Sequence, residues 1–108
     1  MGIHLEGRMD PDGSRVIIPI GDLDRDAADT LATAVNESLA HPPGRLVIQM
    51  THVQFCDSSG IVTLLDAHAD AAQLGTELVL AGVSDHLRAL FQICALDQVV
   101  RIVEESRG

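Results

Sequence analysis

Two adjacent serines, Ser58 and Ser59, follow an aspartate and precede a glycine in the segment "QFCDSSGIVTLL", residues 54–65. Hydroxyl groups in such a place can do three different things. They can accept hydrogen bonds from the free N–H groups at the start of a helix, which stabilises the helix by about 0.5–2 kcal/mol. They can attack a substrate as nucleophiles, or they can be modified by another enzyme.

Helix capping is the simplest of these roles. Asp57, Ser58 or Ser59 could each cap the helix whose apolar residues follow. A cap needs only one such side chain, however, and here three polar residues and a glycine stand in a row after a strand-like stretch. Capping therefore explains one of the three polar side chains and leaves two without a role.

A catalytic serine finds little support elsewhere in the chain. The G-x-S-x-G sequence of serine hydrolases is absent, and the nearest histidine, His52, has no partner that would orient it. His68 falls on the apolar face of a helix, where a buried or boundary role is more common than catalysis. The histidines show no i, i+3 or i+4 pair, and there is no glycine-rich phosphate loop. We therefore predict no catalytic residue, no metal site and no cofactor.

A phosphorylated aspartate at position 57 is a further possibility, because Asp57 follows a strand-like segment. Proteins that use such a phospho-aspartate surround it with other carboxylates that hold Mg²⁺, and with a lysine. The seven basic residues of this chain are all arginines. The sequence therefore excludes this chemistry.

A regulated serine fits the physical setting better. A hydroxyl in the first turn of a helix is exposed and held in a defined position. Phosphorylation would add a charge of about −1.5 to −2, which the N–H groups and dipole of the helix start tolerate. A protein that covered this surface would then have to bury a dianion beside Asp57. Such a serine would switch docking while leaving the domain folded.

Charge and composition exclude several other functions. Seven basic and sixteen acidic residues give a formal net charge of −9, which disfavours binding to nucleic acid or to anionic membranes. Aromatic residues make up only 2% of the chain, with no Trp or Tyr, so platforms for stacking bases are nearly absent. An acidic domain suits a partner with a basic patch. The same charge favours a monomer.

The two cysteines, Cys56 and Cys94, are isolated and form no C-x-x-C motif. We expect reduced thiols in a cytoplasmic protein. The first ten residues lack the features of a secretory signal, and no stretch approaches the ~18 apolar residues of a membrane span.

The spacing of apolar residues predicts the elements that must position the serines. A turn at "MDPDGS", residues 9–14, predicts a hairpin over residues 3–20, in which Pro19 marks a sheet edge or the end of strand pairing. An apolar stripe from Ala28 to Leu39 predicts the first helix. The further predicted elements are a strand over residues 45–50, a helix from the serines to Gly75, a strand over 76–82, a helix capped by Ser84 and a strand over 98–103, followed by a polar tail.

Together these elements predict an α/β fold in the order β-β-α-β-α-β-α-β. The length of 108 residues fits a single domain, residues 1–108, with a core of about residues 5–103. We expect a mixed sheet of four to five strands with helices packed mainly on one face. The inward positions are predicted to be Ile61, Leu64, Leu65, His68 and Ala72 on the second helix, and Leu87, Leu90, Phe91 and Cys94 on the third.

In the segments around residues 21–24 and 57–60 the sequence resembles a known family, the STAS domains, and among them the bacterial anti-sigma-factor antagonists. The resemblance rests on "GDLD" at the end of the second predicted strand, on "DSSG" at the start of the second helix, and on the order of the elements. It covers nearly the whole chain. Such proteins are not enzymes: they bind an anti-sigma factor that is also a GHKL-type serine kinase, and so release a sigma factor. Phosphorylation by that kinase ends binding, and a PP2C-type phosphatase restores it.

The resemblance also implies roles for individual residues. Ser58 matches the phospho-acceptor, and Asp57, Ser59 and Gly60 complete its motif. Asp22 and Asp24 match the acidic part of the partner-binding surface, although the family more often has Glu at the position of Asp22. The alternative within this fold is a permanent interaction subunit of a transporter or a sensory assembly, in which Ser58 would only cap a helix.

Overall fold

A five-stranded mixed sheet forms the framework, and its strands lie side by side in chain order. The computed structural model describes residues 3–104. The strands are β1 (His4–Met9), β2 (Arg15–Ile20), β3 (Arg45–Gln49), β4 (Glu77–Ala81) and β5 (Arg101–Val103). The helices are α1 (Arg25–Leu39), α2 (Ser58–Gln73) and α3 (Asp85–Ile93), followed by the short 3₁₀ helix η1 (Leu96–Gln98). The predicted α/β fold and element order are confirmed; residues 105–108 of the predicted polar tail lie outside the described residues.

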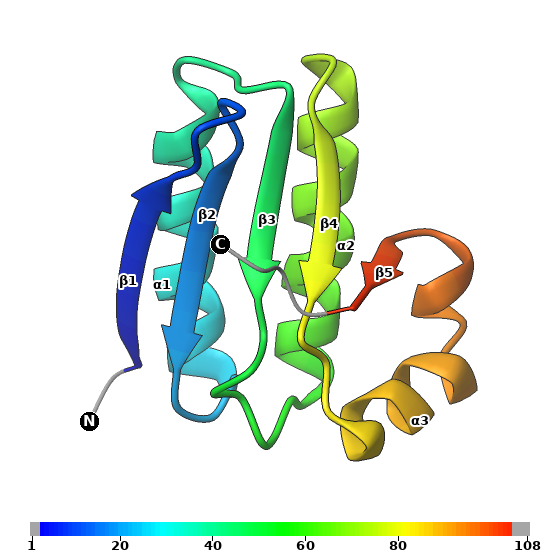
Figure 1. Ribbon diagram of the computed structural model, residues 1–108. Helices are drawn as coiled ribbons and strands as arrows, with labels where there is room; N and C mark the ends of the chain where they lie inside the picture. Colours follow the sequence, from blue (N-terminus) through cyan, green and yellow to red (C-terminus); the bar gives the residue numbers. More distant parts are fainter. Residues whose placement is uncertain (1–2, 105–108) are drawn as a thin grey trace.

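The hairpin of β1 and β2 is antiparallel, and all other neighbouring strands are parallel. Figure 1 shows α1 and α2 behind the sheet, while β2, β3 and β4 all point to the lower end of the view. Because a parallel strand is followed by a helix that returns across one face, all three helices begin at this lower end. The carboxyl ends of the strands are therefore where the helix starts gather.

Pro19 shows how the hairpin meets the rest of the sheet. β2 lies between β1 and β3, so the prediction of an edge position is wrong. Pairing of β2 with β3, however, runs only from Arg15 to Ile17, while Pro19 still lies opposite Leu5 of β1. Since proline has no N–H to donate, it is accommodated beyond the end of the parallel ladder, as the second part of the prediction stated.

The core lies between the sheet and the helices. The predicted stripe of α1 is buried at Ala28, Leu31, Val35 and Leu39. On α2 the most buried residues are Gly60, Leu64, Ala67 and Ala71, which follow i, i+4, i+7 and i+11. Ala72, which we expected on this face, is exposed. One step of the helix, about 100°, separates it from Ala71 and turns it to the solvent.

The chain after α3 departs most from the prediction. Cys94 was expected on the inner face of α3 but is exposed, because the helix ends at Ile93. Ala95 then adopts a left-handed conformation with φ of 62°, and the 3₁₀ helix η1 begins directly after it. This turn takes up the start of the predicted last strand and shortens it to β5. Leu96 and Val100 are buried and close the core at this side.

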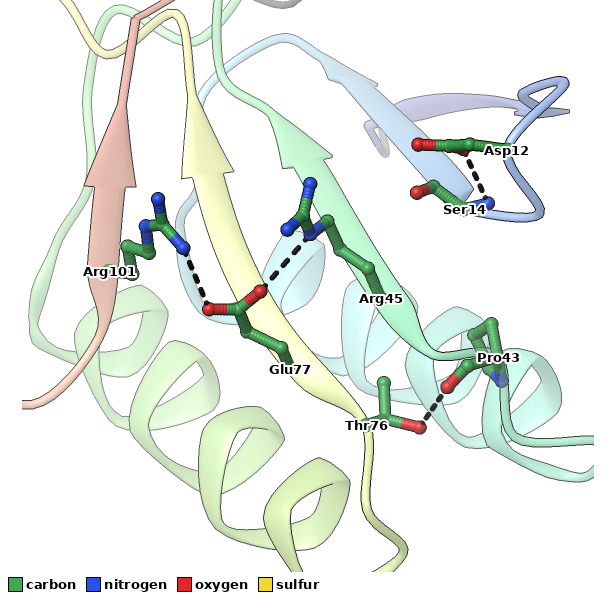
Figure 2. Close-up of polar contacts among 7 residues, drawn as sticks. All are labelled: Asp12, Ser14, Pro43, Arg45, Thr76, Glu77 and Arg101. Carbon is green, nitrogen blue, oxygen red and sulfur yellow. Dashed lines mark hydrogen bonds and ion pairs between the residues drawn. The ribbon is translucent and has the colours of Figure 1, made fainter.

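The amino ends of the parallel strands are joined by ion pairs (Figure 2). Arg45 donates to one oxygen of Glu77 at 3.1 Å, and Arg101 donates to the other at 3.0 Å. The hydrogen bond from Arg101, together with the interaction with Arg45, lowers the pKa of Glu77. These groups are half exposed, so each pair contributes about 0.2–1 kcal/mol. They link β3, β4 and β5 at the end of the sheet opposite the helix starts.

The chain contains two phenylalanines, and they form a matched pair for testing the core. Phe91 is fully buried, whereas Phe55 is 49% exposed. We expect Phe91→Ala to lower the free energy of unfolding by about 3–5 kcal/mol, because it leaves a cavity. Phe55→Ala should change it by less than about 0.5 kcal/mol. Urea unfolding followed by circular dichroism measures both; equal losses would contradict this description of the core.

Candidate functional site

Two loops meet at the carboxyl ends of β2 and β3, one leading into α1 and the other into α2. The Leu23 N–H donates to the Phe55 carbonyl at 2.8 Å, and the Asp57 N–H donates to the Leu23 carbonyl at 3.2 Å. Gly21 donates in the same way to the His52 carbonyl at 3.2 Å. These backbone bonds join the "GDLD" and "DSSG" segments, so the two parts of the predicted partner surface lie together.

Each of the two helices is capped by an aspartate. Asp57 Oδ1 accepts hydrogen bonds from the N–H groups of Ser59 at 2.9 Å and Gly60 at 3.2 Å. Asp24 Oδ1 accepts from the N–H of Ala27 at 3.0 Å at the start of α1. Of the three candidates for the cap of α2, the structure therefore selects Asp57. Neither serine is needed for this purpose.

Ser58 is the first residue of α2, and its side chain is exposed. Ser59 is half buried. Within residues 3–104, the hydroxyl groups of both serines lack a hydrogen-bond partner. A catalytic serine needs a base within hydrogen-bond reach, and none is present here among the described side chains. The arrangement suits a hydroxyl that another protein reaches from outside.

Gly60 brings the first turn of α2 against the neighbouring loop. A Cβ atom at this position would lie 2.9 Å from the carbonyl oxygen of Leu23 and 2.7 Å from the sulfur of Cys56. Both distances are shorter than carbon can approach without moving its neighbours, and one of those neighbours is backbone. Glycine is therefore required here because of the close approach of two chain segments.

A shallow groove of about 490 Å³ runs beside the serines between α1 and α2. Its apolar part includes Val62, which is 53% exposed, and Phe55 provides a second exposed apolar side chain on the loop before the serines. The lining residues are Arg25, Ala28, Asp29 and Ala32 from α1, and Ser58, Ser59, Val62, Thr63 and Asp66 from α2. The hydroxyl of Ser58 thus stands beside a surface that combines apolar and charged side chains.

The structure brings the predicted site residues together in one region but gives them different functions. Asp24 and Asp57 are caps, Gly60 is a packing contact, and Asp22 is exposed on the loop before α1. Arg25, Phe55 and Val62 were not predicted as part of the site. Arg25 follows "GDLD" directly, but its position beside the serines depends on which helices are neighbours, which local periodicity does not specify.

Cys56 lies under the site and is 4% exposed. Burial raises the pKa of its thiol to about 12, and the Asp57 carboxylate and Cys94 act in the same direction. Both cysteines are free. Cys56 therefore stays protonated at neutral pH and acts as an apolar packing residue.

Within residues 3–104, neither a group of metal ligands nor a helix that could span a membrane is found. Their histidine, cysteine and acidic side chains include no group of three or more that could hold a metal ion. None of the helices in this part of the chain combines the length and the apolar character that crossing a membrane requires.

A protein-family model matches most of the chain. A model described as "Mlab, STAS domain" matches residues 20–104. The anti-sigma-B factor antagonists of Listeria monocytogenes and Listeria innocua are each 39% identical to the chain over 57 residues. That alignment covers 53% of this chain and 50% of each Listeria protein. The chain therefore spans about half the length of the curated relatives it matches.

Solved structures share the fold over nearly the full length. An anti-sigma factor antagonist from Mycobacterium paratuberculosis is 26% identical, with a TM-score of 0.76 over 93% of this chain and 84% of that one. The Bacillus cell fate determinant SpoIIAA in its phosphorylated form is 18% identical, with a TM-score of 0.74 over 96% and 93%. A sulfate transporter family protein from Wolinella succinogenes is 21% identical, with a TM-score of 0.80 over 93% and 83%. The predicted STAS fold is confirmed, and proteins with different roles share it.

The contact of Gly60 with Leu23 can be tested with a second glycine as control. We expect Gly60→Ala to lower the free energy of unfolding by about 1–3 kcal/mol, because the added methyl group meets the Leu23 backbone. Gly44 has open space around the same position and needs no left-handed conformation, so Gly44→Ala should change stability by less than about 0.5 kcal/mol. Thermal or urea unfolding compares the two. A Gly60→Ala variant as stable as Gly44→Ala would show that the two segments are not in contact.

The two cysteines should differ in their reaction with iodoacetamide. The thiolate is the reactive form, so Cys56, with its raised pKa and buried sulfur, should remain unmodified in the folded protein at about pH 8. Exposed Cys94 should react. Mass spectrometry should therefore find one adduct in the native protein and two after denaturation. Modification of Cys56 at the rate of Cys94 would mean that the core beneath the site is open.

Proposed function

Since this chain belongs to the STAS domain family, we propose that it is an anti-sigma-factor antagonist whose docking is switched off by phosphorylation of Ser58. The observation that carries the proposal is the Ser58 hydroxyl itself. It is exposed, it begins α2, and the cap formed by Asp57 leaves it without a structural task. The protein would then act as a binding switch and not as an enzyme.

The proposed partner is an anti-sigma factor of the GHKL-type serine kinase class, and a PP2C-type phosphatase would reverse the modification. The names of the Listeria relatives support an anti-sigma factor as the partner, because both are called antagonists of one. The Bacillus protein with this fold has a phosphorylated form. We propose that the switch acts in the cytoplasm, because such a kinase requires the ATP of that compartment.

The proposed docking surface consists of Asp22, Phe55, Ser58 and Val62. The net charge of −9 suits a partner with a basic patch, and the two exposed apolar side chains can be covered on binding. Asp24 and Asp57 contribute from the helix starts, and the backbone N–H groups of Ser59 and Gly60 hold the first turn against the Asp57 carboxylate. A phosphate on Ser58 would stand within this surface.

Phosphorylation would change docking more than folding. The reaction transfers the γ-phosphoryl group of ATP to Oγ of Ser58, releases ADP, and passes the hydroxyl proton to the kinase. The product carries about −1.5 to −2 charge at a helix start, where N–H groups and the helix dipole favour an anion. A partner in contact with the same surface would have to remove water from this group beside the acidic loops.

Incubation with the matching anti-sigma kinase and ATP should add one phosphate, at Ser58. Ser58→Ala should stay unlabelled, while Ser59→Ala, the matched control, should still be labelled. We expect the phosphorylated protein to bind the kinase at least about tenfold more weakly, since a partner that covers the surface must remove water from a dianion, which costs several kcal/mol. The far-ultraviolet circular dichroism spectrum should not change.

Two results would contradict the proposal. One is phosphate on the Ser58→Ala variant, which would place the acceptor elsewhere. The other is equal affinity of the phosphorylated and unphosphorylated forms, measured by isothermal titration calorimetry. Equal affinity would favour a permanent interaction subunit of a transporter or sensory assembly, in which Ser58 has no regulatory task.

A further inference from the structure

The starts of α1 and α2 resemble each other and lie side by side. Asp24 caps α1 and Arg25 is its first residue; Asp57 caps α2 and Ser58 is its first residue. The backbone bonds at Leu23 hold the two starts in a fixed relation. Arg25 and Ser58 consequently line the same groove between the helices.

Arg25 is the single basic residue among those that line this groove. Its guanidinium forms no ion pair with any side chain of residues 3–104. Most of the other arginines in that part of the chain are paired with a carboxylate; they are Arg8, Arg45, Arg88 and Arg101. An arginine without an ion pair among residues 3–104 therefore lines the same groove as the hydroxyl that we propose as the phosphate acceptor.

We propose that Arg25 binds the phosphate group of phosphorylated Ser58. This inference rests on the proposed function, because it needs a phosphate at that position. The planar guanidinium offers parallel N–H donors that match two phosphate oxygens. In the unphosphorylated protein Arg25 lines the groove without an ion pair to any of the described side chains; in the phosphorylated protein it joins the starts of the two helices through the phosphate.

The pairing explains how an acidic surface accepts a further dianion. The charged groups around Ser58 come from both helices and from the loops before them; they are Asp22, Asp24, Arg25, Asp29, Asp57 and Asp66. The carboxylates favour the singly charged phosphate and so raise its second pKa, whereas Arg25 favours the doubly charged form and lowers that pKa. Arg25 would keep the phosphate largely dianionic near neutral pH, where a partner that covers it must remove water from the full charge.

The second pKa of the phosphoserine, near 6 in the absence of neighbours, measures this interaction directly. The full chain can be produced with phosphoserine incorporated at position 58 during translation, so neither kinase nor partner is required. A pH titration followed by ³¹P NMR then compares the parent, Arg25→Gln and Arg15→Gln. Arg15 is an exposed arginine without an ion pair among residues 3–104, at the opposite end of β2, so its variant removes the same charge at a distance.

We expect Arg25→Gln to raise the second pKa by about 0.5 unit, the size typical of an exposed ion pair, and Arg15→Gln to leave it unchanged. The same titration curve for both variants would overturn the proposal. Arg25 is exposed, so its variant should unfold at the temperature of the parent, and a thermal scan checks this. Because the phosphate is introduced without a kinase, failure of this test is separate from failure of the kinase to modify Ser58.

Discussion

The close approach of the first turn of α2 to Leu23 is the constraint on which the site depends. Gly60 is the residue that permits it, since any side chain would meet the Leu23 carbonyl or the Cys56 sulfur. The same Leu23 carbonyl accepts the Asp57 N–H, and the Leu23 N–H binds the carbonyl of Phe55. Packing and hydrogen bonding therefore act at one point, and they set two helix starts beside each other at the carboxyl edge of the sheet.

With the two starts in place, the caps determine what the serines can do. Asp57 satisfies the N–H groups of Ser59 and Gly60, so the helix keeps its start whether or not the Ser58 hydroxyl is modified. If a serine were the cap, phosphorylation would disturb the hydrogen bonds that its oxygen accepts from the helix N–H groups. Modification would then change the stability of the helix as well as the docking surface. Because the cap and the hydroxyl belong to two adjacent residues, Asp57 and Ser58, the cap can stay in place while the hydroxyl is modified.

Sequence reasoning succeeded where a local pattern decides the outcome. The apolar stripe of α1, the turn at "MDPDGS" and the helix after "DSSG" each follow from short-range spacing or turn chemistry. It was wrong or left the answer open where the outcome depends on alternatives of similar local preference: Ala72 was expected inward in place of Ala71, and the cap was left open among Asp57 and the two serines. The left-handed Ala95 is a conformation that favours glycine, so nothing in its residue type predicted the end of α3 and the exposure of Cys94. Arg25 was missed because its proximity to Ser58 exists only once α1 and α2 are packed together.

Charged side chains are compensated by different groups at the two ends of the sheet. At the amino ends of the strands, Glu77 is shared between Arg45 and Arg101, so the charges compensate each other within the domain. At the carboxyl ends, the carboxylates of Asp24 and Asp57 face backbone N–H groups, and partial charges of the helix starts provide their compensation. Partial charges of this kind come from inside the domain and are available to a phosphate as well. A partner approaching from outside has no access to them, and it would have to supply its own compensation for each charge it covers. The same phosphate can therefore leave the stability of its own domain unchanged and still lower the affinity of the protein that binds that domain.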